Sequence, residues 1–235
     1  MNIKQITKKF IPPFITGAYH FCLVLLGAFI YRFPGYDKNL KIIGVTGTSG
    51  KSTTTDLICR ILEEAGYSVA SFSTVRFKVG KREWKNELKM TMPGRMKVQK
   101  FLRQAVNAKC QFAVLEVSSE GIRQYRHKFI NFDSAVFTNL TPEHIESHGG
   151  FENYRNEKLK LFKVTKNIHV INADDKNEKY FLEIPAKQII KFSVKDNQQY
   201  KLNLKLVGEF NLMNALAALS VAKAYSISEA VGKKA

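Results

Sequence analysis

Two spacings of apolar residues alternate along most of this chain, one typical of buried strands and one typical of amphipathic helices. From residue 41 onward, short apolar runs predict six strands, at residues 41–45, 68–75, 111–117, 134–138, 168–172 and 188–192. Between these runs, apolar residues three and four apart predict helices at residues 53–65, 96–108, 151–164 and 211–224. The alternation predicts an α/β fold with a mainly parallel sheet flanked by helices on both faces.

The first 40 residues depart from this alternation. Residues 14–31 form an apolar run that is almost free of charge, between Pro12-Pro13 and Pro34-Gly35. As a helix, the run is close to the length of about 20 residues that spans a bilayer, and a basic start before an apolar stretch also resembles a signal peptide. Three interpretations stay open: a helix that lies on the membrane or packs on the protein, a membrane span, and a cleaved signal.

We therefore expect two parts, an apolar N-terminal segment at residues 1–40 and one α/β domain at residues 41–235. The apolar run must bury itself against something, because its exposure to water is unfavourable. Basic residues lie on both sides of it: Lys4, Lys8, Lys9 and Arg32. They favour an acidic membrane surface, so we expect the first part to be a membrane-proximal or docking helix.

The net charge narrows the partners that this chain can have. It carries 37 Lys and Arg residues against 20 Asp and Glu, a formal charge of +17 that favours nucleotides, phosphorylated substrates or acidic lipid. The basic residues are spread along the chain without a nucleic-acid-binding motif, so we do not expect nucleic acid as a partner. Three cysteines with no paired or metal-type spacing are typical of a reducing compartment, which indicates the cytoplasm.

Residues 44–55, GVTGTSGKSTTT, carry the strongest chemical signal. They follow a predicted strand and lead into a predicted helix, an arrangement in which backbone N–H groups surround a phosphate at the positive end of the helix dipole. Lys51 can then reach the terminal phosphates, and the Ser52 hydroxyl can bind Mg²⁺. Val45 stands where the strict P-loop spacing has its first glycine. The loop predicts ATP binding by Gly47, Thr48, Ser49, Gly50, Lys51, Ser52 and Thr53.

Two further motifs follow predicted strands, and we expect them at the carboxyl edge of the sheet, where ligands bind in open α/β sheets. Glu116 ends one strand, which places its carboxylate beside the Mg²⁺ of the loop; the alternative is a surface glutamate at a strand end. His144 and His148 have a zinc-like spacing on a helix. No third soft ligand is near them, so we favour one histidine near Mg²⁺ and one structural histidine.

Two later helices carry polar residues at positions that need an explanation. Lys158 shares a helix face with Tyr154 and Leu161, which is unusual because burial of an ammonium group is costly; the alternative is a side chain that reaches the surface. Asn211 and Asn214 lie one turn apart at a helix start. Asn211 can be a helix cap, whereas the Asn214 amide is a candidate for reading a base edge.

Together these motifs resemble the Mur ligases, the enzymes that extend the stem peptide of peptidoglycan. The matching segments run in family order across about residues 41–224: they are residues 44–55, 91–93, 115–119, 137–149, 154–162 and 208–218. They are most similar to the branch that adds the third stem-peptide residue to UDP-N-acetylmuramoyl-L-alanyl-D-glutamate. The resemblance implies that residues 41–235 form a Mur ligase central ATP-binding domain, built on a P-loop-type sheet.

The resemblance implies an ATP-dependent acid–amino-acid ligase, which activates a carboxylate as an acyl phosphate and joins it to an amine. Its implied catalytic residues are Lys51, Glu116, His144 and Lys158. Its implied ligands for two Mg²⁺ ions are Ser52, Glu116, His144 and Lys158, the last with a carboxylated Nζ. The implied adenine contacts are Asn211 and Asn214. The implied substrates are a UDP-linked muramoyl peptide and the amino acid that is added to it. The implied contacts to the muramoyl peptide are Thr91, Ser118 and Arg126.

Several departures from the family pattern bear on the function. Glu120 stands where the family usually has histidine, and Met92 occupies the second position of a Thr-Thr-Pro motif. We expect this sequence to lack the N-terminal UDP-binding domain and the C-terminal ligase domain, so a separately encoded C-terminal domain is an expected partner. Two alternatives stay open, a ligase that adds glutamate to folate and a non-catalytic ATP-binding module. We expect a cytoplasmic protein, peripheral to the inner face of the membrane.

Overall fold

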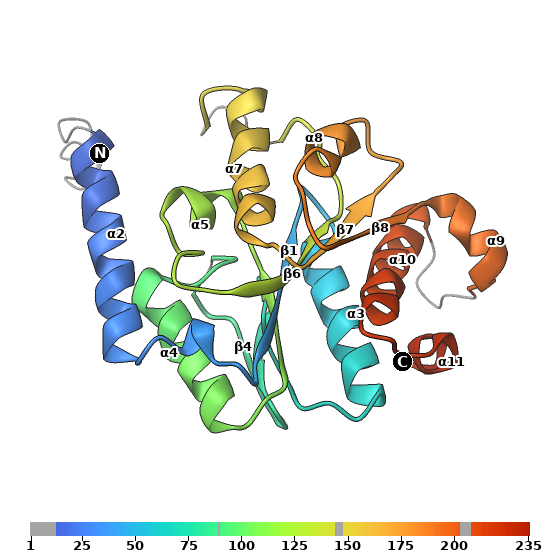
Figure 1. Ribbon diagram of the computed structural model, residues 1–235, viewed down its shortest axis with the longest axis horizontal. Coiled ribbons are helices and arrows are strands. Elements are labelled where there is room, and N and C mark those ends of the chain that lie inside the picture. Colours follow the sequence, from blue (N-terminus) through green and yellow to red (C-terminus); the bar gives the residue numbers. More distant parts are fainter. Residues whose placement is uncertain (1–12, 89, 144–147, 203–207) are drawn as a thin grey trace.

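The computed structural model describes residues 13–88, 90–143, 148–202 and 208–235, and it confirms the expected α/β architecture (Figure 1). Within these residues, eight strands form one sheet in the order β4-β3-β2-β5-β1-β6-β7-β8. Six of them are the predicted strands. These six are neighbours in the sheet, in the order β2-β5-β1-β6-β7-β8, and every neighbouring pair among them is parallel. They are β1 (Lys41–Thr46), β2 (Val69–Phe72), β5 (Phe112–Glu116), β6 (Phe132–Phe137), β7 (Ile168–Asn172) and β8 (Gln188–Phe192).

The sheet continues past β2 into an antiparallel hairpin that the apolar pattern did not predict. In it, β3 (Arg76–Val79) pairs with β2, and β4 (Arg82–Lys85) pairs with β3. All residues of β4 are exposed and most side chains of the hairpin are charged, so no apolar run marks it. The strand predicted at residues 68–75 is shorter than expected because the chain turns after Phe72 to start this hairpin.

Four long helices match the predicted helices to within two residues at each end. They are α3 (Lys51–Glu64), α4 (Arg95–Asn107), α7 (Phe151–Val164) and α10 (Glu209–Ala224). The structure adds short helical segments that the sequence did not predict, because one or two turns are too short to establish a periodicity. These are η1 (Pro34–Tyr36), α5 (Ser119–Arg123), α8 (Glu178–Leu182), η2 (Val194–Asp196), α9 (Asn197–Tyr200) and α11 (Glu229–Lys234).

Helices cover both faces of the sheet, and successive residues of the central strand β1 face opposite cores. Ile42 belongs to the core that α4 and α7 cover, whereas Ile43 belongs to the core that α3 and α10 cover. Figure 1 shows these two pairs of helices on opposite sides of the sheet. Because both faces are covered, the loops at the carboxyl ends of the parallel strands are the place for binding and chemistry.

The apolar N-terminal run forms α2 (Pro13–Ile30), which packs along α4 (Figure 1). Val24 and Ala28 of α2 are fully buried. The approach is close at Gly27, where a Cβ atom would lie 3.1 Å from the Cα of Met96. No helix in the described part of the chain is long and apolar enough to cross a membrane. The packing favours the first of the three interpretations of this segment, a helix packed on the protein.

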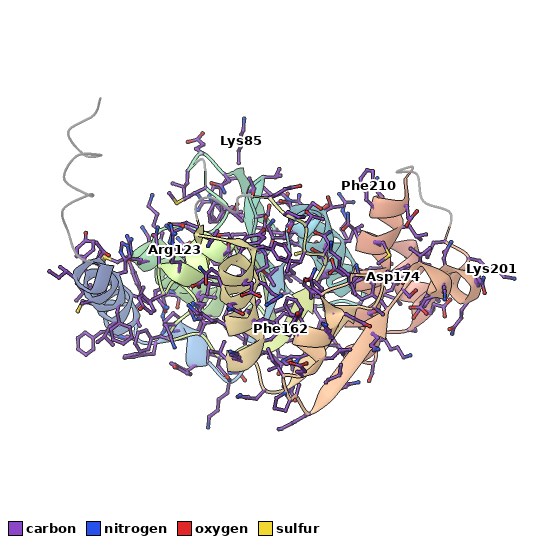
Figure 2. All side chains as sticks on the ribbon, turned by 90° about the horizontal axis from the view of Figure 1, so that it is seen from above. Lys85, Arg123, Phe162, Asp174, Lys201 and Phe210 are labelled. Carbon is purple, nitrogen blue, oxygen red and sulfur yellow. The ribbon has the colours of Figure 1, made fainter. Side chains whose placement is uncertain are left out.

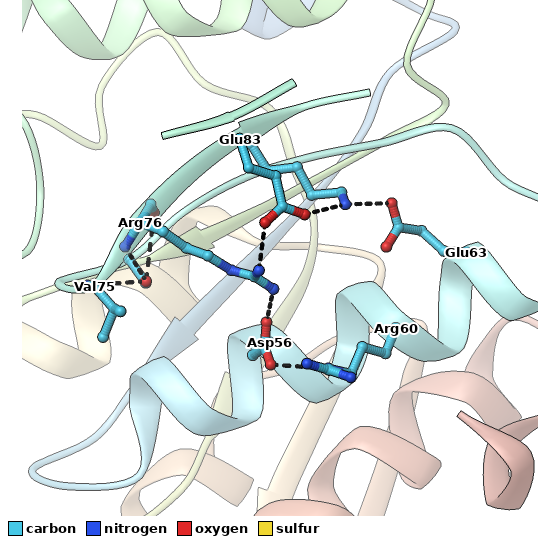
Figure 3. A network of polar contacts seen from close by, with 8 residues as sticks. Asp56, Arg60, Glu63, Val75, Arg76 and Glu83 are labelled. Carbon is cyan, nitrogen blue, oxygen red and sulfur yellow. Dashed lines mark hydrogen bonds and ion pairs between the residues drawn. The ribbon is translucent and has the colours of Figure 1, made fainter. Parts of the chain in front are cut away.

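An ion-pair network attaches the hairpin β3–β4 to α3 (Figure 3). Arg76 pairs with Asp56 of α3, and it lies 2.6 Å from Glu83 of β4. Lys78, which is largely buried, lies 2.9 Å from Glu63 of α3 and 2.5 Å from Glu83. The hydrogen bond from Lys78 is the main cause that lowers the pKa of Glu83. The network thus holds an edge hairpin that contributes few apolar side chains to the core.

We expect Arg76→Ala to lower the free energy of unfolding by about 0.5–1 kcal/mol, because partly exposed ion pairs contribute little singly. Urea unfolding followed by circular dichroism measures the change. Arg60→Ala is the matched control, since it removes only the exposed pair with Asp56 along α3, and it should have a smaller effect. A loss of several kcal/mol in Arg76→Ala would contradict this modest role.

Candidate nucleotide and substrate site

The glycine loop lies between β1 and α3, as the sequence predicted, and neighbouring segments hold it in place. Ser49 donates its backbone N–H to Asn139 Oδ1 over 2.9 Å, and the Thr138 hydroxyl donates to Ser49 O over 2.8 Å. Gly50 has a φ of 77°, and a Cβ atom there would lie 2.2 Å from Asn214 Oδ1. Both the backbone conformation and the contact with α10 therefore require glycine at this position.

Glu116 lies at the carboxyl end of β5, directly beside the start of α3. The Ser52 hydroxyl donates to Glu116 Oε2 over 2.7 Å. Thr74 donates to the same carboxylate through its backbone N–H at 2.7 Å and through its hydroxyl at 3.2 Å. Only 2% of the Glu116 surface is exposed. The alternative of a surface glutamate is therefore wrong, and the carboxylate lies beside the loop as expected.

The Ser52 hydroxyl and the Glu116 carboxylate fit a Mg²⁺ ion, because both are hard oxygen ligands and they lie in contact. Mg²⁺ is usually held by one or two protein ligands together with water and substrate phosphates. Among the described residues, no group of three or more His, Cys, Asp or Glu side chains could hold a metal ion by itself. The site thus suits a metal ion that arrives with nucleotide phosphates.

Of the two histidines with the zinc-like spacing, only His148 lies within the described residues. His144, an expected metal ligand, lies outside the described residues. His148 Nε2 lies 3.1 Å from Ser119 Oγ, and its ring centroid lies 5.1 Å from that of Tyr154. Burial lowers the pKa of His148 below its usual range, and the charge of Arg123 lowers it further. A hydrogen bond and a ring contact therefore hold His148 in place, which agrees with a structural role.

Two lysines from different elements contact the backbone of the loop. Lys51 Nζ donates to Thr48 O over 2.7 Å, and Lys158 Nζ of α7 donates to Gly47 O over 2.7 Å. Only 1% of Lys158 is exposed, and its Nζ lies 4.4 Å from the centre of the Tyr154 ring. The alternative of a lysine that reaches the surface is therefore wrong, and the inward placement is confirmed.

Burial is the main cause that lowers the pKa of both lysines. For Lys51, the charges of Glu116 and Glu143 oppose this shift. For Lys158, the pKa lies well below its usual range because the charge of Lys51 adds to the effect of burial. Lys158 therefore loses its proton more readily than an ordinary lysine.

A cavity of about 500 Å³, which we call the α5 pocket, lies on one side of the loop. Its wall consists of Gly47, Thr48, Lys51, Met90, Thr91, Met92, Ser118, Ser119, Glu120, Gln124, Arg126, His148, Tyr154 and Lys158. The wall includes the expected substrate contacts Thr91, Ser118 and Arg126. Arg126 is largely buried and donates to Gln124 Oε1 over 2.7 Å and to the carbonyl of Met92. Its guanidinium group makes the pocket suitable for an anionic ligand.

Glu120, one of the two residues of this wall that depart from the family pattern, has partners of its own. Glu120 lies 2.6 Å from Arg123 in an ion pair and accepts a hydrogen bond from Gln124. Figure 2 shows Arg123 at the end of the molecule where α2 lies, far from Lys201. Ser118 also has a structural duty, because its hydroxyl caps α5 by accepting from Gly121 N at 3.1 Å. Both positions thus shape α5 as well as the pocket.

A second cavity of about 730 Å³, which we call the α10 pocket, lies on the other side of the loop. Its wall consists of Ser49, Gly50, Thr138, Asn139, Asn172, Asp174, Asp175, Val194, Lys195, Glu209, Phe210, Met213 and Asn214. Figure 2 shows Asp174 and Phe210 toward the same end of the molecule, away from α2. Asn214, an expected adenine contact, is part of this wall, and its Oδ1 also accepts from the Thr54 hydroxyl at 3.2 Å. Asn211, the other expected adenine contact, is a described residue of α10 but is not part of this wall as described.

Asn139 and Gln124 are the clearest site residues that the sequence reasoning missed. Both polar atoms of the Asn139 side chain bind the loop: Oδ1 accepts from the Ser49 N–H, and Nδ2 donates to Ser49 O over 3.2 Å. It follows β6 much as Glu116 ends β5, so the rule that singled out one strand end would have found the other. Gln124 carries no such signal, since its place in the pocket depends on the packing of α5.

Residues 45–201 match the family model of the Mur ligase middle domain. A UDP-N-acetylmuramyl-tripeptide synthetase of Roseiflexus sp. (strain RS-1) is 34% identical over 87% of this chain and 48% of that protein. A UDP-N-acetylmuramoyl-L-alanyl-D-glutamate--2,6-diaminopimelate ligase of Syntrophomonas wolfei is 35% identical over 85% of this chain and 46% of that protein.

The fold is also similar to that of a solved ligase. A solved structure of a UDP-N-acetylmuramoyl-L-alanyl-D-glutamate--2,6-diaminopimelate ligase is similar with a TM-score of 0.73 at 27% identity. The match covers 84% of this chain and 46% of that one. The chain therefore spans about half the length of the curated relatives it matches.

Proposed function

Because this chain belongs to the Mur ligase family through its middle domain, we propose that it is the ATP-binding part of a ligase that forms an amide bond in peptidoglycan precursor synthesis. One observation carries the proposal: residues of the glycine loop form part of the wall of both pockets. A nucleotide in the α10 pocket can therefore extend its phosphates along the loop toward a carboxylate in the α5 pocket. The relatives are about twice as long, so we propose that a C-terminal domain completes the site.

In the proposed reaction, a substrate carboxylate attacks the γ-phosphate of ATP to give an acyl phosphate, and an amine then displaces inorganic phosphate. The loop N–H groups orient the phosphates, and Lys51 neutralises the charge on the transferred phosphoryl group. Ser52 and Glu116, together with His144, would hold Mg²⁺, which supplies further charge neutralisation when bound. The protein thus contributes positioning and electrostatic stabilisation, which are the main requirements of phosphoryl transfer.

The proposed carboxylate substrate is a UDP-linked muramoyl dipeptide, and the proposed amine is an amino acid. The names of the relatives suggest this substrate class, and the buried guanidinium of Arg126 in the α5 pocket suits its anionic groups. Thr91 and Ser118 would add neutral hydrogen-bonding groups in the same wall. Since ATP and nucleotide-linked precursors are cytoplasmic, we place the protein in the cytoplasm.

We also propose that Lys158 carries a carboxyl group on Nζ. Burial and the charge of Lys51 lower the pKa of Lys158, which favours the neutral amine, the form that attacks CO₂. The new N–C bond forms as the amine loses a proton, and the product is an anionic carbamate. An anion beside Lys51 is favourable where a second ammonium group is not, and its oxygens are suitable ligands for a second Mg²⁺.

Glu116→Gln tests the proposed Mg²⁺·ATP site with little change in shape. The neutral amide is a poorer Mg²⁺ ligand than the carboxylate, so we expect affinity for ATP in the presence of Mg²⁺ to fall by about tenfold or more. Isothermal titration with ATP, with and without Mg²⁺, measures the change. Glu120→Gln is the matched control, because it removes a carboxylate from the α5 pocket without touching Ser52. If the response to Mg²⁺ stays the same in Glu116→Gln, the assignment fails.

A further inference from the structure

We propose that α2 and the basic side of α4 form a surface that docks on an anionic membrane. The outer side of α2, which we call the docking face, is apolar along its whole length. It consists of Ile15, Ala18, Tyr19, Cys22, Leu25, Leu26, Phe29 and Ile30. Figure 1 shows α2 at one edge of the molecule, at the opposite end from α10 and α11.

The docking face has the spacing and exposure of a helix that lies on a lipid surface. Its residues recur three and four positions apart, so they share one side of α2. Phe29 is 70% exposed, Tyr19 is 58% exposed and Leu26 is 48% exposed, whereas Val24 on the opposite side is fully buried. No charged residue interrupts the helix. A continuous apolar stripe of this kind is unfavourable in water and is suited to the boundary between headgroups and acyl chains.

The charges beside this face select an anionic partner. The sequence contains no acidic residue at positions 1–36 and none at positions 95–110, the segment that includes α4. Arg32 at the end of α2 is exposed. Lys100 of α4 is also exposed, and it lies one helical turn from Met96 and Arg103, which lie against Gly27 and Tyr31. Basic residues that flank an apolar helix attract the negative surface of a membrane and add to the binding of the apolar face. Anionic lipid therefore fits both properties of the surface.

A small hollow at the end of the docking face suits a lipid phosphate. It has a volume of about 220 Å³, and its wall consists of Ile30, Tyr31, Arg32, Arg103 and Asn107. Arg103 of α4 donates to Tyr31 O over 2.9 Å and to Arg32 O over 3.1 Å. These hydrogen bonds tie the end of α2 to α4 and hold a guanidinium group beside the apolar stripe. The hollow thus places positive charge where a headgroup would meet the helix.

Docking in this way would orient the α5 pocket relative to the membrane. Arg95 of α4 lies 3.1 Å from His20 Nε2 of α2, and the same guanidinium nitrogen donates to Gln124 Oε1 over 2.8 Å. Gln124 is part of the pocket wall. Two side-chain contacts therefore connect the helix that docks with the cavity that we propose for the substrate.

Vesicle sedimentation of the full chain tests the proposal. We expect binding to vesicles that contain phosphatidylglycerol, much weaker binding to pure phosphatidylcholine, and release from the anionic vesicles as salt rises. Phe29→Glu should weaken binding by about tenfold or more, because it puts a charge in the apolar stripe. Lys100→Ala should weaken it by about fivefold, as expected for one basic residue near the surface. Both side chains are exposed, so the variants should keep the fold, and circular dichroism checks this.

Ile189→Glu is the matched control, because it introduces the same charge in place of a partly exposed apolar side chain outside the docking face. Ile189 lies in β8, the edge strand at the opposite end of the sheet from β4. It should bind vesicles as the unchanged chain does. Equal binding of Phe29→Glu and the unchanged chain would overturn the proposal, as would equal binding to neutral and anionic vesicles. Light scattering after gel filtration tests whether the docking face instead binds a second copy of the chain. If the unchanged chain is a dimer that Phe29→Glu dissociates, and it does not bind vesicles, the face belongs to a dimer interface and the proposal is overturned.

Discussion

Replacing Lys158 by alanine should reduce ligase activity by on the order of 100-fold or more, the effect of removing one group that stabilises charge in a transition state. Lys158 is almost fully buried, its Nζ contacts Gly47 O of the glycine loop, and it lines the α5 pocket. Phosphate release, with UDP-linked dipeptide, amino acid and a C-terminal domain of a relative supplied, measures the change. We expect added acetate or formate to restore part of the activity, because a short carboxylate can occupy the place of the carbamate.

The control for this variant lies two residues along the same helix. Lys160→Ala removes an exposed lysine that pairs with Glu157 at 2.6 Å, and it should leave the activity unchanged. Rescue by carboxylates distinguishes a lost carbamate from a damaged fold, since a merely structural defect would not respond to them. Full activity of a folded Lys158→Ala would contradict the role, and loss of activity without rescue would contradict the carboxylated form.

The pH dependence provides a second check of the same residue. Carbamate formation needs the neutral amine, and the lowered pKa of Lys158 makes that form available at a lower pH than for an ordinary lysine. Activity should therefore fall as the pH decreases through the lowered pKa, and should recover when CO₂ is supplied at a pH above it. This dependence is expected to disappear in carboxylate-rescued Lys158→Ala, because acetate replaces the carbamate.

Replacing Lys51 by alanine should weaken Mg²⁺·ATP binding by about tenfold to a hundredfold, which corresponds to about 1.5–3 kcal/mol for hydrogen bonds to a charged group. Lys51 is the lysine of the loop, and its Nζ lies at the wall of the α5 pocket, 2.7 Å from Thr48 O. The alanine variant keeps the backbone N–H groups of the loop, so some phosphate affinity should survive. Isothermal titration measures binding, and phosphate release measures the loss of turnover.

Lys163→Ala is the matched control for Lys51→Ala. It removes the same charge from an exposed position near the end of α7, and its affinity for Mg²⁺·ATP should equal that of the unchanged chain. Unchanged affinity in a folded Lys51→Ala would show that the loop does not hold the terminal phosphates. Binding that is retained by the unchanged chain but never leads to turnover, even with a C-terminal domain, would favour a non-catalytic ATP-binding module.

Much of the fold could be predicted from the sequence, because the relevant signals are local. Apolar runs marked the six parallel strands, and three-to-four spacing marked the four long helices. The hairpin β3–β4 escaped because charged side chains dominate it, and ion pairs to α3 hold it at the edge. Such pairs join residues far apart in the chain, so no local pattern announces them.

For the candidate site, too, some residues could be predicted from local sequence signals and others could not. The glycine loop and Glu116 could be found because each stands at the end of an apolar strand, and strand ends meet at one edge of a parallel sheet. Asn139 also follows a strand, so its place at this edge was predictable but its partner was not, and Gln124 carries no such signal. Asn139 matters because it contacts Ser49 across 90 positions, and Gln124 matters because α5 turns it toward Arg126.

The sequence by itself determined the α/β class, the family resemblance and the place of the glycine loop, because periodicity and short motifs depend on neighbouring residues. Only the tertiary structure decided between the alternatives that the sequence left open. It buried Lys158 against the loop, placed Glu116 in contact with Ser52, and packed α2 along α4. The physical reason is that burial, pKa and pocket shape arise from contacts between distant segments. These contacts depend on how the sheet pairs and how the helices pack on it.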